Sequence, residues 1–258
     1  YTTFINAFTI ADGSYAWSQP IQLQQQLGSV VPLKQGLLVG AADNGNTQML
    51  SYGTGEGLWG KNGRGITTKG PLNGAVAIGD RILLTSGGDK GMAELVDASG
   101  TELWKKPVKL DGAIDNVVLL NGGVLVASTE EMDVVDLSTG SSVLDHTFKG
   151  GAGLVAREGT DVLMLNAKDG LLYKVTASGA TAVSQTPVAF EGKEKPTKLE
   201  AIAEGYLVSS DQNLALIDRI GAIKYQKYIP APRASGLTRA LDYASAIRAA
   251  YCTAVFGY

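Results

Sequence analysis

Short runs of apolar residues recur along the chain, and turn-forming residues separate one run from the next. Representative runs are Leu37-Leu38-Val39, Ile82-Leu83-Leu84 and Val124-Leu125-Val126, and each follows a turn that contains glycine. Short β-prone runs bounded by Gly, Asn and Asp are typical of strands joined by tight hairpins. The pattern therefore predicts an all-β structure for most of the chain.

One motif, a glycine with a large apolar residue four positions later, recurs along the sequence. Its six copies are Gly13/Trp17, Gly55/Trp59, Gly100/Trp104, Gly140/Leu144, Gly179/Val183 and Gly221/Tyr225. The glycines are separated by 42, 45, 40, 39 and 42 residues, and all three tryptophans occupy the second position of the motif. We expect the glycine to adopt a positive φ in a hairpin turn and the aromatic side chain to pack between neighbouring sheets.

Two further hairpins fall within each period, which gives four strands for every ~40 residues. A four-stranded sheet repeated in this way predicts a β-propeller. Residues from about 28 to 229 supply five complete blades, whereas residues 3–10 and 15–23 supply only the last two strands of a further blade. Because proteins avoid open sheet edges, we expect other sequence to complete this half blade, giving six or more blades in the full protein.

The composition changes abruptly after Pro230-Ala231-Pro232. Residues 235–252 are rich in alanine and carry an apolar stripe at helical spacing, which predicts an α-helix. We therefore divide the chain into a propeller, residues 1–229, and a C-terminal helical segment, residues 230–258. Two roles stay open for this helix: it packs on the propeller, or it docks a partner.

The spacing apolar-x-Asp-x-x-x-Gly-x-x-x-Trp occurs where Asp97, Gly100 and Trp104 follow a strand. It resembles the PQQ-like repeat, which is found in quinoprotein alcohol dehydrogenases and in non-catalytic relatives such as the outer-membrane assembly lipoprotein BamB. The resemblance covers residues 1–229, although the last three copies of the motif lack the tryptophan.

The non-catalytic branch of this family is the better match. The family's dehydrogenases hold their quinone between a tryptophan and a vicinal disulfide, beside a calcium ion. The chain has one cysteine, Cys252, so such a disulfide cannot form. We therefore expect no cofactor, and we assign no catalytic, cofactor-binding or metal-binding residue.

Charge and hydropathy narrow the range of partners. The formal net charge is −3, so the chain lacks the basic surface that nucleic-acid binding needs. Membrane-spanning helices need about 18 consecutive apolar residues, and we expect no such span here. Proteins are then the expected partners, bound through the loop faces of the propeller or through the C-terminal helix.

Three groups of polar residues could be catalytic or metal-binding, but each is explained more simply by its place in the fold. His146 is the only histidine, and we expect it to face solvent in an outer strand. The stretch 43–46 resembles part of a calcium loop, but it lacks the acidic residue that closes such a site and is explained by a hairpin turn. Glu130, Glu131 and Asp133 form an acidic cluster, which we expect to be solvated at a hairpin tip.

Two loops are also interpreted as structural. The mixed-charge loop around Pro196 carries Lys193, Lys195 and Lys198 with two glutamates, and its charge is too balanced for nucleic acid. The glycine-rich stretch 60–65 lacks the ending of a phosphate-binding loop. We expect it to be a mobile connection between blades, on a rim that could bind a partner.

Three functions remain in competition. The favoured one is a non-catalytic scaffold that binds proteins in a bacterial cell-envelope complex, in the periplasm or at the outer membrane, a location implied by the resemblance. The second is a fragment of a quinoprotein-type oxidoreductase. The third is a glycan-binding propeller that would use exposed aromatic residues such as Tyr15, Tyr52 or Tyr206.

Overall fold

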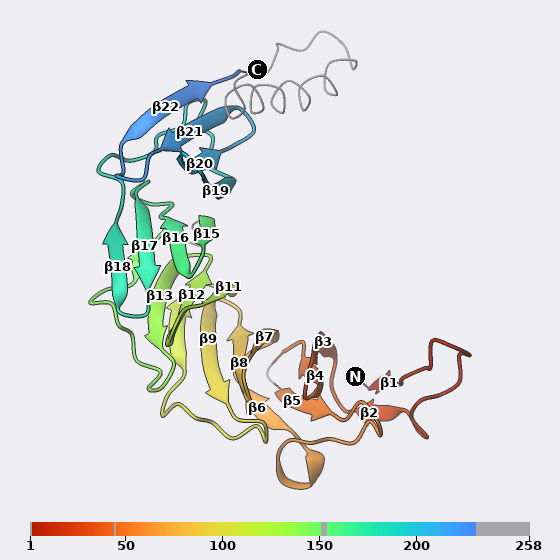
Figure 1. Cartoon of the computed structure of the whole chain (residues 1–258). Coiled ribbons are helices and arrows are strands. Elements are labelled where there is room, and N and C mark those ends of the chain that lie inside the picture. Colours follow the sequence, from red (N-terminus) through yellow and green to blue (C-terminus); the bar gives the residue numbers. More distant parts are fainter. Residues whose placement is uncertain (1, 44, 151–153, 231–258) are drawn as a thin grey trace.

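The structure is a computed structural model that describes residues 2–43, 45–150 and 154–230 (Figure 1). Within these residues the strands form five four-stranded sheets and one two-stranded sheet, and every pairing is antiparallel. The prediction of five complete blades and a half blade is therefore confirmed. The helix expected at 235–252 lies outside the described residues.

The first sheet pairs two short strands, β1 (Thr3–Ile5) and β2 (Ile21–Leu23). Blade I contains β3 (Leu27–Leu33), β4 (Gly36–Ala41), β5 (Gly45–Leu50), the 3-10 helix η1 (Lys61–Gly63) and β6 (Ile66–Thr68). Blade II contains β7 (Leu72–Ile78), β8 (Arg81–Gly87), β9 (Lys90–Val96) and β10 (Val108–Asp111). Blade III contains β11 (Ile114–Leu119), β12 (Gly123–Ser128), β13 (Glu131–Asp136) and β14 (Phe148–Lys149). Blade IV contains β15 (Leu154–Glu158), β16 (Asp161–Leu165), β17 (Leu172–Thr176) and β18 (Gly179–Ala182). Blade V contains β19 (Lys198–Ile202), β20 (Gly205–Ser209), β21 (Asn213–Ile217) and β22 (Ile223–Tyr228).

The blades follow one another along an arc in sequence order (Figure 1). Within each blade the four strands pair in the order in which they occur in the chain. The first strands lie on the inner side of the arc, and those of neighbouring blades contact each other, as β3 contacts β7 and β15 contacts β19. The loops that join strands are consequently presented on the two faces of the arc.

The hydrophobic core lies in layers between adjacent sheets. The layer between blades I and II joins Leu38 and Met49 to Ile82 and Leu84, and all four side chains are almost fully buried. Similar clusters lie at each of the other joints between sheets. A middle strand is therefore covered on both faces, and its residues are buried whichever way they point.

The tryptophans of the motif lie in these layers and are almost fully buried. Each indole Nε1–H donates to a backbone carbonyl of the next sheet along the chain. The bonds run from Trp17 to Tyr52 O at 2.8 Å, from Trp59 to Ala98 O at 2.9 Å, and from Trp104 to Leu137 O at 3.1 Å. The prediction that the aromatic residue packs between sheets is confirmed.

The motif glycine makes room for this indole. Gly55, Gly100 and Gly140 have φ values of +75°, +81° and +72°. A Cβ atom at these positions would lie 2.8, 2.8 and 2.5 Å from an indole atom of the preceding sheet. The motif therefore joins two sheets: the tryptophan of one packs on the turn glycine of the next.

A polar group holds the joint between blades IV and V, where the motif residue is Val183. Glu158 of β15 forms an ion pair with Arg219 and accepts a hydrogen bond from Tyr206 Oη at 3.1 Å. The Arg219 guanidinium lies 5.1 Å from the centre of the Tyr206 ring. The ion pair and the Tyr206 hydrogen bond thus cross this joint beside its hydrophobic cluster, and the cation–π contact lies within blade V.

Candidate functional site

The first sheet carries an exposed apolar surface, which we call the first-sheet face and define as Phe4, Phe8, Ile10 and Tyr15. These side chains are 63, 56, 103 and 68% exposed. Phe8 and Tyr15 pack together with ring centres 4.8 Å apart. The neighbouring Ile5 packs toward blade I, so Phe4 points to the opposite side of the sheet. Phe8, Ile10 and Tyr15 lie on the connection between β1 and β2. Exposed large apolar side chains on one short hairpin are typical of an interaction surface.

The turn beside this face has the geometry of the other motif turns. Gly13 has φ +71° and donates its N–H to Thr9 O at 2.8 Å, as Gly140 donates to Asp136 O at 2.9 Å. The carbonyl of the next residue, Leu137, accepts the indole N–H in that turn. The corresponding carbonyl beside Gly13 is that of Ile10, and no atom of the described residues lies within 4 Å of a Cβ built on Gly13. The turn therefore has the backbone geometry of the turns that receive an indole.

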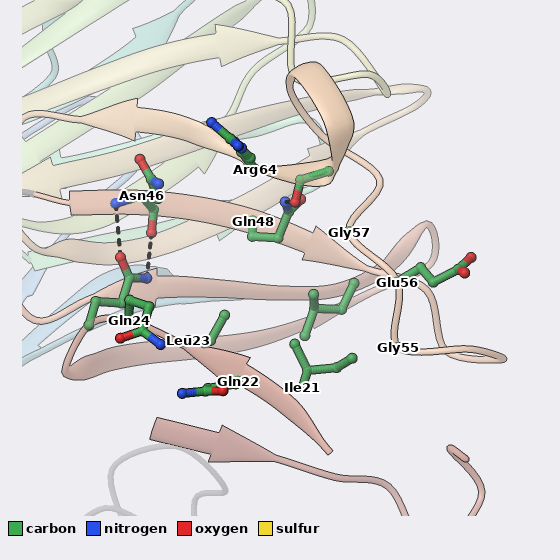
Figure 2. Close-up of a pocket in the computed structure, with 13 residues that line it drawn as sticks. Ile21, Gln22, Leu23, Gln24, Asn46, Gln48, Gly55, Glu56, Gly57 and Arg64 are labelled. Carbon is green, nitrogen blue, oxygen red and sulfur yellow. Dashed lines mark hydrogen bonds between the residues drawn. The ribbon is translucent and has the colours of Figure 1, made fainter. Parts of the chain in front are cut away.

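A groove of about 360 Å³ runs along the other side of β2, between the first sheet and blade I (Figure 2). Ile21, Leu23 and Leu50 supply its apolar lining. Amide side chains supply much of the polar lining: Gln22, Gln24, Gln25, Asn46 and Gln48. An apolar lining with several amides suits hydrogen bonding to a polypeptide backbone more than acid–base chemistry.

Two of these amides are fully used in holding the groove together. Gln25 accepts a hydrogen bond from Asn46 N at 3.0 Å and donates to Asn46 O at 2.8 Å, the two contacts dashed in Figure 2. Gln48 accepts from Trp59 N at 3.0 Å and donates to the Gly63 carbonyl. The groove is therefore rigid on the side of blade I.

Glu56 and Arg64 border the same groove and are exposed (Figure 2). Neither forms an ion pair with another residue of the described chain. Their charges remain available to a ligand at the edge of the groove.

The acidic cluster differs from its predicted state. Only Glu130 is exposed, whereas Glu131 and Asp133 are each 5% exposed in β13. The prediction that all three are solvated was wrong for these two, because blades II and IV cover both faces of the middle strands of blade III.

Glu131 lies in an ionic network at the joint between blades II and III. Its carboxylate pairs with Lys149 and accepts hydrogen bonds from Asp111 N at 2.7 Å and Thr147 Oγ1 at 2.9 Å. Burial raises the pKa of Glu131, but these hydrogen bonds outweigh burial and hold the pKa below its usual value. Lys149 also lies 3.5 Å from Asp111, which pairs in turn with Lys90. Each charged group of the network has an opposite charge within 4 Å, so we interpret the network as structural.

Asp133 is in a different environment on the same strand. Burial raises the pKa of its carboxyl group, and the hydrogen bond from Ser142 Oγ at 2.7 Å opposes this effect. Ser142 Oγ also lies 3.1 Å from Leu144 O, and no histidine hydrogen-bonds to Asp133 or Ser142 among the described residues. Its raised pKa follows from packing between blades.

The other predicted positions occupy loops and turns. His146 is exposed in the bend that precedes β14, as expected for a solvent-facing residue. Asp43 lies at the turn between β4 and β5, and Asn44 lies outside the described residues. The stretch 60–65 contains η1 and connects β5 to β6. The expectation that it connects two blades was wrong, because β5 and β6 pair in one sheet. Lys198 pairs with Glu200 at 2.9 Å.

The three tyrosines proposed for glycan binding do not form a common platform. Tyr15 packs on Phe8, and Tyr52 donates its hydroxyl to Leu33 O at 2.9 Å. Tyr206 is 6% exposed, because Glu158 and the Arg219 guanidinium cover it. The expectation that Tyr206 is exposed was wrong.

Across residues 2–43, 45–150 and 154–230, no group of three or more His, Cys, Asp or Glu side chains is placed to hold a metal ion. The same residues contain no helix long and apolar enough to span a membrane. The sequence singled out neither the first-sheet face nor the groove. The run 21–26, with four glutamines around Ile21 and Leu23, was the available signal for the groove.

Comparisons with known proteins find likeness among solved structures alone. No family model matches the chain, and no curated protein matches it. Among solved structures, the computationally designed Ika8 protein superposes with a TM-score of 0.57 at 15% identity, over 89% of this chain and 70% of that one. BamB from Moraxella catarrhalis gives a TM-score of 0.49 at 18% identity, over 89% and 69% of the two chains. Sqt1 from Saccharomyces cerevisiae gives 0.49 at 12% identity, over 92% and 73%. Identities this low concern the fold alone: the chain is a β-propeller of four-stranded blades.

Proposed function

We propose that this chain is a non-catalytic scaffold of the PQQ-like propeller class that binds a protein partner in a bacterial cell-envelope complex. The first-sheet face is the observation that carries the proposal. Phe4, Phe8 and Tyr15 are more than half exposed, and Phe8 and Tyr15 pack together. Exposed apolar clusters of this kind are typical of protein-binding surfaces.

The groove on the other side of β2 supports the same function. Gln22 is opposite Phe4 in the β1–β2 pair, so a protein segment that covers Phe4 can reach its amide. Amides hydrogen-bond a peptide backbone, and Glu56 and Arg64 add charges of both signs at the edge. The apolar face would provide most of the binding energy, and the groove would provide selectivity.

Site-specific photocrosslinking of the full-length protein in its native cells tests this proposal. A photoreactive benzoylphenylalanine replaces Phe8 in one variant and Leu103 in a control. Leu103 is an exposed apolar residue, 44% exposed, on blade II. We expect the Phe8 probe, and not the Leu103 probe, to form an adduct whose mass increases by that of one distinct polypeptide. Cell fractionation of the same samples should recover the adduct with the envelope.

Three results would contradict the proposal. The Phe8 probe could form only crosslinks within its own chain, which would show that this chain covers the face itself. Both probes could capture the same set of proteins, which would indicate non-specific contact. The adduct could fractionate away from the envelope, which would contradict the proposed location.

A further inference from the structure

A second cavity, of about 520 Å³, lies at the joint between blades III and IV, far along the chain from the first sheet. It is lined by Asp115, Thr129, Gly150, Leu154, Leu165, Asn166, Ala167, Lys168, Gly170, Val188, Lys195 and Pro196. Its volume falls within the range of small-molecule sites, and such sites combine an apolar lining with a few polar groups. Leu154, Leu165 and Val188 belong to the core cluster between blades IV and V and form that apolar lining.

Asn166 provides a buried hydrogen-bond donor in this cavity. The residue is 3% exposed, and its Oδ1 accepts the backbone N–H groups of Lys168 at 2.7 Å and Asp169 at 3.4 Å. Its Nδ2 has no hydrogen-bond partner among the residues that the structure describes. The side chain lines the cavity, so a molecule inside it can accept this bond. Although the residue is almost fully buried, its Nδ2 atom is accessible, so a ligand in the cavity can replace water as its acceptor.

The other deeply buried asparagine of the described chain shows the usual arrangement. Asn213 is also 3% exposed, and its Nδ2 donates to Glu191 O at 3.0 Å and to Glu194 Oε2 at 2.9 Å. Its Oδ1 accepts from Glu191 N at 3.0 Å. The buried amide of Asn213 therefore has hydrogen-bond partners on both its nitrogen and its oxygen.

The charged residues of the cavity favour an anion. Lys168 and Lys195 both line it, and neither has a carboxylate within ion-pair distance in the described part of the chain. One carboxylate, that of Asp115, lines the side formed by blade III. Two ammonium groups and one amide donor outnumber this single carboxylate. Asp115 and the Thr129 hydroxyl can accept or donate a further hydrogen bond to a polar substituent.

We propose that this cavity binds a small organic anion, a carboxylate with a short apolar body. The carboxylate accepts hydrogen bonds from Asn166 Nδ2 and the two ammonium groups. The apolar body packs on Leu154, Leu165 and Val188. Because the ligand contacts blades III and IV, its binding also stabilises the joint between them.

Calorimetric titration of the full chain with hexanoate tests this inference, with hexylamine as a ligand of equal length and opposite charge. We expect hexanoate to bind and hexylamine to bind at least about tenfold more weakly, because the charge-assisted bonds are lost. Asn166→Asp keeps the oxygen that caps the 168–169 turn and removes the donor. We expect it to weaken hexanoate at least about tenfold. Lys168→Gln and Lys195→Gln should each weaken it by about three- to tenfold.

Lys224→Gln, on the exposed strand β22, is the matched control and should leave hexanoate affinity unchanged. Equal affinities for hexanoate and hexylamine would overturn the proposal, as would no heat of binding for either. Unchanged affinity in the Lys168→Gln/Lys195→Gln double variant would overturn it even if Asn166→Asp fails to fold. Substitution at Phe8 should not alter hexanoate binding. Either proposal, the anion site or the protein partner, can therefore be refuted without refuting the other.

Discussion

At the motif turns, two blades come into contact because glycine has no side chain. Gly140 has φ +72°, and a Cβ there would lie 2.5 Å from the Trp104 indole. Gly13 has nearly the same φ, +71°, but no atom within 4 Å of its Cβ position. Substituting alanine at each glycine therefore distinguishes the free-energy cost of backbone strain, present at both, from that of steric contact, present only at Gly140.

We expect Gly140→Ala to destabilise the chain by about 3 kcal/mol or more, because it combines left-handed strain with displacement of a buried indole. Gly13→Ala should cost only the strain, about 1 kcal/mol. Urea denaturation of both variants, monitored by tryptophan fluorescence, measures the difference. Equal losses of stability would show that the indole does not depend on the glycine.

At the scale of the strand, β13 shows how ionisable residues are accommodated between blades. The folded-state pKa of Glu131 is lowered, so its ionised form stabilises the folded state at pH values above the unfolded pKa of about 4.3. This contribution is lost as the pH falls through the lower folded-state value. The raised pKa of Asp133 acts in the opposite sense, because its ionisation disfavours the folded state as the pH rises.

Glu131→Gln should therefore destabilise the chain near neutral pH by about 1–3 kcal/mol, since Lys149, Thr147 and Asp111 N lose a charged acceptor. The difference from the unsubstituted chain should shrink as the pH approaches about 3. Urea midpoints measured across this pH range test the expectation. The neighbouring Glu130 is exposed, and Glu130→Gln should change stability by less than about 0.5 kcal/mol. A difference independent of pH would contradict the role assigned to ionised Glu131.

The sequence was informative about strands and turns and less so about burial. The spacing of Gly100 and Trp104 predicts both the turn and the packing of the indole, because those properties are local to one hairpin and its neighbour. The burial of Glu131 depends on Lys149 and Asp111, which lie on other strands, and on coverage by a second blade. The polar residues on one face of β13 are therefore buried. The alternation of polar and apolar residues along one strand does not show whether a second blade covers its polar face.

At the scale of the whole molecule, the joints between sheets differ in chemistry along the arc. Trp17, Trp59 and Trp104 join the first sheet and blades I, II and III in succession. The joint between blades IV and V adds the ion pair of Glu158 and Arg219 to its hydrophobic cluster. Each blade contacts mainly its neighbours, so stability should behave as a sum of blade and joint contributions.

The position of a joint along the arc should then determine which blades are destabilised when that joint is disrupted. Trp17→Ala removes the contact between the first sheet and blade I, and we expect faster hydrogen exchange mainly in β1 and β2. Trp104→Ala lies between two complete blades, so exchange should accelerate on both sides, in β8, β9, β12 and β13. Each substitution should cost about 3–5 kcal/mol locally. Peptide-resolved hydrogen exchange with mass spectrometry distinguishes these patterns. If Trp17→Ala accelerated exchange equally in blade V, the blades would unfold as one cooperative unit. In that case binding at the first-sheet face would stabilise the whole arc, whereas under nearest-neighbour coupling it would protect only the first sheet and blade I.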